Sequence, residues 1–153
     1  MLKVKFSINH IMTVELLNLD DKSPNLIQNL WIIERTSGIC IFEKNFEENR
    51  KIQFPNNLIC GFLSAISMLA LEVFAENINY IKFSNSKLYF KKTSNFLFIF
   101  RFQNQHPYSS QKIMNLIKDI SKMFADMYDN TVQHWNRDVR QFKTFSRHLE
   151  KLL

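Results

Sequence analysis

The chain has 153 residues, of which 46% are apolar and 15 are phenylalanine, and its formal net charge is +6. A chain of this size and composition can bury a substantial core as one domain, which excludes general disorder. No apolar run reaches the roughly 20 uninterrupted residues that a membrane-spanning helix needs. The start, MLKVKFSINH, lacks an unbroken apolar stretch and a small-residue cleavage site, so we expect no signal peptide and a cytoplasmic protein.

The first 28 residues form an N-terminal extension of alternating apolar and polar residues. Leu2 to Asn9 alternate with the period of a strand, and Met12 to Leu16 alternate again. We expect a hairpin over residues 1–17, with a short helix over residues 11–19 as the alternative. The polar run DDKSP then indicates a loop.

From Asn29 the pattern predicts a second hairpin. The runs NLWIIER and ICIFEKNF have strand character, and Thr36 to Gly38 separate them as a tight turn. The charged segment FEENRKIQ, residues 46–53, connects this hairpin to the next element.

Residues 54–76 predict one buried helix that begins near Pro55, with Asn56 and Asn57 as candidate caps. At 100° per residue its apolar side chains spread over more than one face, so we expect a cover on both sides. One cover is the sheet of the same domain, and the other is a partner or the N-terminal extension. The only residues that interrupt the apolar surface are Gly61, Ser64, Ser67 and Glu72.

Three short strands are predicted next, over residues 78–84, 87–92 and 95–103, as an antiparallel meander. In the last of them one face is phenylalanine, at positions 96, 98, 100 and 102, and the other carries Leu97 and Ile99. A strand that is apolar on both faces belongs at the centre of a sheet with helices above and below.

Two helices are predicted to end the chain. Ser109 and Ser110 can cap the first, which has a single apolar stripe from Ile113 to Met127. The second helix follows Asn136, and its apolar face consists of Val139, Phe142, Phe145, Leu149 and Leu152.

Catalysis finds little support in the residue pattern. The two glycines form no phosphate-binding loop, and the four histidines are scattered without metal-ligand spacing. The two cysteines, Cys40 and Cys60, are expected to be buried thiols. We therefore expect no enzyme, no cofactor and no metal.

This order of segments, with these residues, resembles a longin domain over residues 29–153. The resemblance rests on LWIIERTSGICIFEKNF, LICGFLSAISMLALEVF, IKFSNSKLYFKKTSNFLFIFRF and VRQFKTF. It implies an α+β fold, with a five-stranded antiparallel sheet that has one helix on one face and two on the other. Longin domains, and the related roadblock domains, are generally non-catalytic adaptors in membrane trafficking and small-GTPase regulation, and they often pair with one another.

The resemblance and the surplus apolar surface together predict a dimerising scaffold. Its partner is expected to be a second copy or another longin or roadblock domain, with a small GTPase and a membrane surface as further candidates. The strand with Tyr80 and Lys82 is expected at the edge of the sheet, where strands can pair. The predicted interface consists of Cys60, Leu63, Leu71, Phe74, Tyr80 and Lys82.

The alternative function is a basic module that binds nucleic acid, because IKFSNSKLYFKK interleaves lysine with aromatic residues. Against it, these aromatic residues alternate as a sheet core does. The excess positive charge lies in two stretches, which are either binding patches or ordinary solvated faces. The patch residues are Lys87, Lys91 and Lys92 in one stretch and Arg137, Arg140, Lys143 and Arg147 in the other.

Overall fold

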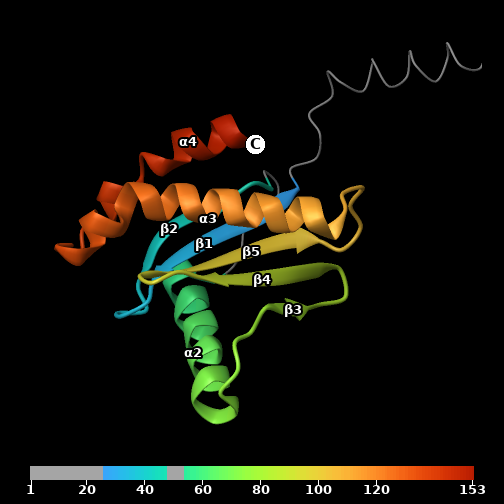
Figure 1. The fold of residues 1–153 in the computed structure, drawn as a ribbon, viewed down its shortest axis with the longest axis horizontal. Helices are drawn as coiled ribbons and strands as arrows, with labels where there is room; N and C mark the ends of the chain where they lie inside the picture. Colours follow the sequence, from blue (N-terminus) through green and yellow to red (C-terminus); the bar gives the residue numbers. More distant parts are fainter. Residues whose placement is uncertain (1–25, 48–53) are drawn as a thin grey trace, which may run out of the picture.

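Figure 1 shows the computed structural model of the chain, which describes residues 26–47 and 54–153. The hairpin predicted for residues 1–17, the DDKSP loop and most of the charged connection at 46–53 lie outside the described residues. Everything below concerns the described part.

The centre of the fold is a five-stranded antiparallel sheet in the order β2-β1-β5-β4-β3. β5 occupies the middle, as its two apolar faces predict, and β3 forms an edge of the described sheet beside β4. β1 begins at Ile27, slightly earlier than the predicted strand, and β3 is shorter than predicted. The strands are β1 (Ile27–Glu34), β2 (Cys40–Asn45), β3 (Tyr80–Lys82), β4 (Ser86–Lys92) and β5 (Phe96–Gln103).

The turn between β1 and β2 requires a left-handed backbone at Gly38, whose φ is 71°. An L side chain seldom adopts this conformation, which is why glycine suits the position. The predicted hairpin is therefore confirmed, and it ends in an edge strand, β2.

Helices cover the sheet in two layers, one on each side (Figure 1). The helix α2 (Asn56–Phe74) lies on one face, and α3 (Ser110–Gln133), η1 (Val139–Phe142) and α4 (Phe145–Leu152) lie on the other. The Ser109 hydroxyl caps α3 by accepting from the Lys112 amide at 3.3 Å. Pro55 is itself the residue before α2, and no side chain caps that helix.

The prediction of one continuous final helix was wrong. A 3-10 turn, η1, comes first, and α4 follows it. Val139, Phe142 and Phe145 recur every three residues, which matches the three residues per turn of a 3-10 helix and not the α-helical period.

The alternation in β5 divides the interior into two apolar clusters. Its four phenylalanines pack with α3, η1 and α4, and ring centroids of Phe96 and Phe124 lie 5.1 Å apart. Leu97 and Ile99 pack on the α2 side with Trp31 and Leu63. The predicted architecture of one α-helix on one face and two on the other is confirmed, with the 3-10 turn η1 between those two.

Candidate interaction surface

The face of α2 that touches the sheet is made largely of small residues. Cys60, Leu63, Ser64 and Ser67 are its buried positions. Small side chains let a helix approach a sheet closely, and the two serines, which interrupt the apolar pattern of the sequence, lie on this inward face. The Ser67 hydroxyl is buried and has no hydrogen-bond partner among the residues that the structure describes.

The prediction of a buried α2 was therefore wrong for most of its length. Phe62 is 64% exposed and Leu69 is 57% exposed. At 100° per residue these two side chains lie on the side opposite the small residues, together with Leu58 and Val73. We call this set the outer stripe, and its members are Leu58, Phe62, Leu69 and Val73.

The second half of α2 extends beyond the sheet, and no residue after Ser67 in this helix is buried (Figure 1). Leu71 and Phe74 continue the inward-facing stripe along the helix, yet they are 43% and 67% exposed. They are exposed because the sheet ends before they do. We call the segment Met68–Phe74 the overhang.

A groove joins the overhang to the edge of the sheet. Its volume is about 450 Å³, and its walls include Leu69 and Phe74 from α2 and Tyr80 from β3. Tyr80 and Phe83 are both more than half exposed. The outer stripe, the overhang, the groove and the β3 edge thus form one continuous, mostly apolar surface.

The predicted interface residues divide between this surface and the core. Leu71, Phe74, Tyr80 and Lys82 are exposed. Cys60 is fully buried and Leu63 is 5% exposed, so a partner cannot reach them in this structure. The prediction treated the inward-facing stripe of α2 as equally accessible along its length, whereas the sheet covers the first half of that stripe.

Sequence reasoning expected α2 to be covered on both sides and left the outer stripe out of the predicted interface. A signal for the correct orientation was present in the side-chain volumes. Cysteine and serine recur at positions 60, 64 and 67, at helical spacing, and large apolar residues lie on the opposite side.

The start of α2 is fastened to the hairpin by a polar bridge. The Trp31 indole Nε1 donates to Asn56 Oδ1 at 3.4 Å, and the Asn56 side chain also hydrogen-bonds Glu43 on β2. Burial raises the pKa of Glu43, and the bond from Asn56 offsets only part of that effect. The attachment of α2 therefore depends on its first three turns.

The structure does not bring the two basic stretches together. Lys87 and Lys91 lie on β4, near the β3 edge, and the other group surrounds η1 and α4 beside β2. β2 and β3 are opposite edges of the sheet. No continuous basic groove therefore connects the two groups in the described residues.

Several of the basic side chains are already engaged. Lys87 Nζ lies 3.7 Å from the ring centroid of Tyr80 and 4.8 Å from that of Tyr89. Lys92 donates to Asn77 at 2.8 Å, and burial, aided by Arg35, lowers its pKa. These contacts indicate a structural role for part of the β4 group.

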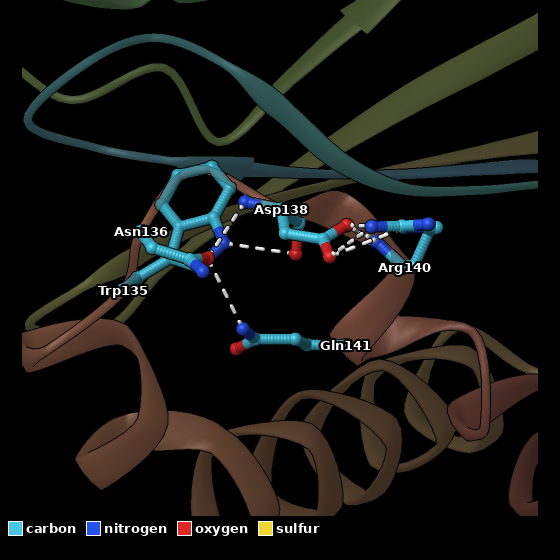
Figure 2. A network of polar contacts seen from close by, with 5 residues as sticks. All are labelled: Trp135, Asn136, Asp138, Arg140 and Gln141. Atoms are coloured by element: carbon cyan, nitrogen blue, oxygen red, sulfur yellow. Dashed lines mark hydrogen bonds and ion pairs between the residues drawn. The ribbon is translucent and has the colours of Figure 1, made fainter.

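The other basic group contains a polar network that shapes the turn before η1 (Figure 2). Arg140 donates to both oxygens of Asp138, at 2.8 Å, and these bonds lower the pKa of Asp138 and raise that of Arg140. Trp135 Nε1 donates to the Asp138 carbonyl, and Asn136 accepts from Gln141. Arg137, Lys143 and Arg147 are exposed around this network.

Within residues 26–47 and 54–153, no group of three or more His, Cys, Asp or Glu side chains is placed to hold a metal ion. In the same ranges, α2 is long and apolar enough to cross a membrane by length and composition alone. Such a helix is weak evidence for a membrane span, because helices of water-soluble domains also meet this criterion.

No protein-family model matches the sequence, and no curated protein matches it. Among solved structures, MglB from Myxococcus xanthus superposes with a TM-score of 0.54 at 12% identity, over 68% of this chain and 85% of that one. The gliding protein MglB from Thermus thermophilus gives a TM-score of 0.43 at 12% identity, over 53% and 64%. The likeness to the Myxococcus protein, together with the strand order, shows that this chain has the longin/roadblock-like fold.

Proposed function

We propose that this chain is a non-catalytic, cytoplasmic interaction scaffold that forms a homodimer through the outer stripe, the overhang and the β3 edge. The observation that carries the proposal is the overhang. Its apolar side chains lie beyond the reach of their own sheet, and exposed apolar surface of this kind favours a partner that covers it. In a symmetric dimer that forms through this surface, each copy covers the exposed apolar side chains of the other.

Charge favours a protein partner over a lipid surface. Helices that lie on anionic membranes carry lysine and arginine on their polar side, and α2 has no basic residue. Its charged residue is Glu72, and Glu76 follows the helix. A membrane surface is therefore the less favoured occupant.

The fold supports a small GTPase as the further partner of such a dimer. Longin and roadblock domains generally act as adaptors for trafficking machinery and small GTPases, and MglB from Myxococcus xanthus is one solved structure with a similar fold. Calorimetric titration with purified small GTPases, loaded with GDP or a GTP analogue, tests this part. If none of these GTPases binds, the proposal of a GTPase partner is wrong, and the dimer proposal is unaffected.

The dimer is tested by light scattering on the full chain and on Leu71→Asp. We expect a dimer mass for the wild type and a monomer mass for the variant, because an aspartate in an apolar interface is costly to desolvate. Met114→Asp is the matched control, since Met114 is 48% exposed on α3, on the opposite face of the sheet. Circular dichroism verifies that each variant is folded.

Three results would contradict the proposal. Leu71→Asp could keep the dimer mass, or Met114→Asp could dissociate as well. The wild type could also be monomeric at every concentration. If it is monomeric, the N-terminal extension is the remaining candidate cover, and deletion of residues 1–25 tests it. Loss of solubility in the truncated chain would indicate that the extension covers the apolar surface.

The arrangement of the basic residues in the described part of the chain does not favour the nucleic-acid alternative. Its basic residues lie at two opposite edges of the sheet, and part of them are engaged by aromatic rings and carboxylates. Retention of a labelled oligonucleotide at moderate salt would nevertheless reverse this preference.

A further inference from the structure

The two cysteines of the chain come from different elements and meet beneath α2. Cys40 begins β2 and is half-buried, and Cys60 lies on the inward face of α2 and is fully buried. Cys40 packs against the apolar cluster that contains Cys60, and its thiol is close enough to raise the pKa of Cys60. Cys40 Sγ also lies 3.6 Å from the Phe42 carbonyl oxygen, to which it donates.

One of the two cysteines, Cys40, borders a cavity that is open to solvent. A cavity of about 530 Å³ lies at the open edge of β2, between the first turn of α2 and the η1 and α4 segments. Cys40 is among its lining residues, together with Glu43, Asn56 and Lys143, whereas Cys60 is not. An outside reagent therefore meets Cys40 first, and Cys60 lies behind it.

We propose that Cys40 and Cys60 are a reversible dithiol–disulfide pair that exchanges with small-molecule disulfides and, when oxidised, ties α2 to β2. The observation behind this proposal is independent of the dimer proposed above. It assigns a site of covalent modification to the helix that carries the apolar surface.

The exchange proceeds in two steps. The Cys40 thiolate attacks one sulfur of a disulfide such as oxidised glutathione, whose S–S bond breaks and releases one glutathione thiolate. The Cys60 thiolate then attacks the Cys40 sulfur of the mixed disulfide and displaces the second glutathione. Two protein thiols have then lost two electrons, the reagent has gained them, and the two protons are carried by the released glutathione thiols.

The surroundings of Cys60 explain this order. In the reduced protein, the contact with Cys40 and then burial raise the pKa of Cys60, and the charge of Glu43 acts in the same direction. The cavity that Cys40 borders is also lined by a positively charged residue, Lys143. Once Cys40 is part of a mixed disulfide it is no longer a thiol that can ionise, which removes its contribution. Reaction at Cys40 therefore makes Cys60 easier to ionise for the second step.

The bond would reinforce a weak attachment. The described residues hold α2 by a short buried stripe and the Trp31–Asn56 contact. A disulfide from Cys40 to Cys60 constrains the unfolded chain between them and thereby raises the melting temperature of the oxidised form.

The test incubates the full-length chain with oxidised glutathione and follows it by intact mass and by peptide mapping without reduction. We expect the wild type to lose two hydrogen atoms in mass, to yield a Cys40–Cys60 linked peptide, and to melt at a higher temperature until dithiothreitol is added. Cys60→Ala is the informative variant, and it should stop at a stable glutathione adduct on Cys40. Cys40→Ala should remain unmodified, because Cys60 has no route to the reagent.

The proposal fails if the wild type stops at the same Cys40 adduct as Cys60→Ala, because the second step would then not occur. It also fails if the wild type remains unmodified, or if the linked peptide joins cysteines of two different molecules. A rise in melting temperature that persists in Cys60→Ala would show that the effect does not come from the disulfide.

Discussion

At the residue scale, one buried carboxylate holds the turn that joins β1 and β2. Glu34 is 8% exposed, and its oxygens accept from the Thr36 amide, the Ser37 amide and the Ser37 hydroxyl at 2.6–2.8 Å. Burial raises the pKa of Glu34, but the hydrogen bonds from Ser37 and Thr36 together outweigh it, so the pKa lies below the usual value.

A depressed carboxyl pKa adds stability above the unfolded-state pKa, and that stability is lost as the pH falls through the folded-state value. We expect Glu34→Gln to lower the free energy of unfolding by about 1–3 kcal/mol at neutral pH, because an amide cannot accept all three bonds. The deficit should shrink as the pH falls through the folded-state pKa of Glu34, because the wild-type carboxyl is then protonated and loses the same bonds.

Urea unfolding of the wild type and the variant, at neutral pH and at a series of lower pH values, measures this effect. Glu150→Gln is the control, since Glu150 forms an exposed ion pair with Lys44 at 2.9 Å, which should contribute little. An equal loss from both variants, or a deficit for Glu34→Gln that grows in acid, would contradict the assignment.

At the element scale, α2 shows the reverse of the usual helix pattern over its first half, with small and polar side chains inward and large apolar ones outward. Such a helix gains little from burial against its own sheet, so its few specific contacts carry more of its attachment. Asn56 provides one of these contacts by linking Trp31 to Glu43.

Asn56→Ala should lower the free energy of unfolding by about 1 kcal/mol, because it leaves the buried Trp31 indole without its hydrogen-bond acceptor. Asn57→Ala is the matched control, since the Asn57 side chain accepts from the adjacent Leu58 amide and not from the sheet. Hydrogen exchange along α2 should accelerate in the first variant only. Unchanged exchange there would show that the bridge does not anchor the helix.

At the scale of the whole molecule, β5 lies between two apolar clusters of unequal size. The larger one is aromatic, and its hub is Phe124, which is fully buried. Its ring lies within 6.3 Å, centroid to centroid, of rings from β2, β5, η1 and α4. Phe124 thus connects the sheet to all the helical segments on that face.

We expect Phe124→Ala to lower the free energy of unfolding by about 3–5 kcal/mol, through lost burial and the cavity that remains. Met114→Ala, on the exposed side of the same helix, should change it by less than about 0.5 kcal/mol. Chemical unfolding compares the two. A small effect at Phe124 would mean that the aromatic cluster can collapse into the space.

Much of the fold was predictable because local patterns agreed with one another. The alternation in β5 predicted a central strand, the Ser37-Gly38 step predicted a hairpin, and Ser109 predicted the start of α3; the structure confirms each. The division of the last helix was missed because a three-residue spacing is easily read as α-helical over so short a run.

The candidate surface was predicted less well, and the reason lies in α2. Periodicity assigns residues to faces of a helix, but it contains no information on where the sheet beneath that helix ends. Leu63 and Phe74 share a stripe, yet the first is buried and the second is 67% exposed. The same limit hid the meeting of Cys40 and Cys60, which are separated along the chain and adjacent across two elements.

The sequence by itself determined the kinds of element, their order and the central place of β5, because these follow from local propensity and from side chains that alternate with a strand's period. Only the tertiary structure decided which side of α2 meets the sheet and how far the sheet extends under it. That choice depends on the packing of small side chains against a surface of finite width, a property of two elements together and of neither one alone.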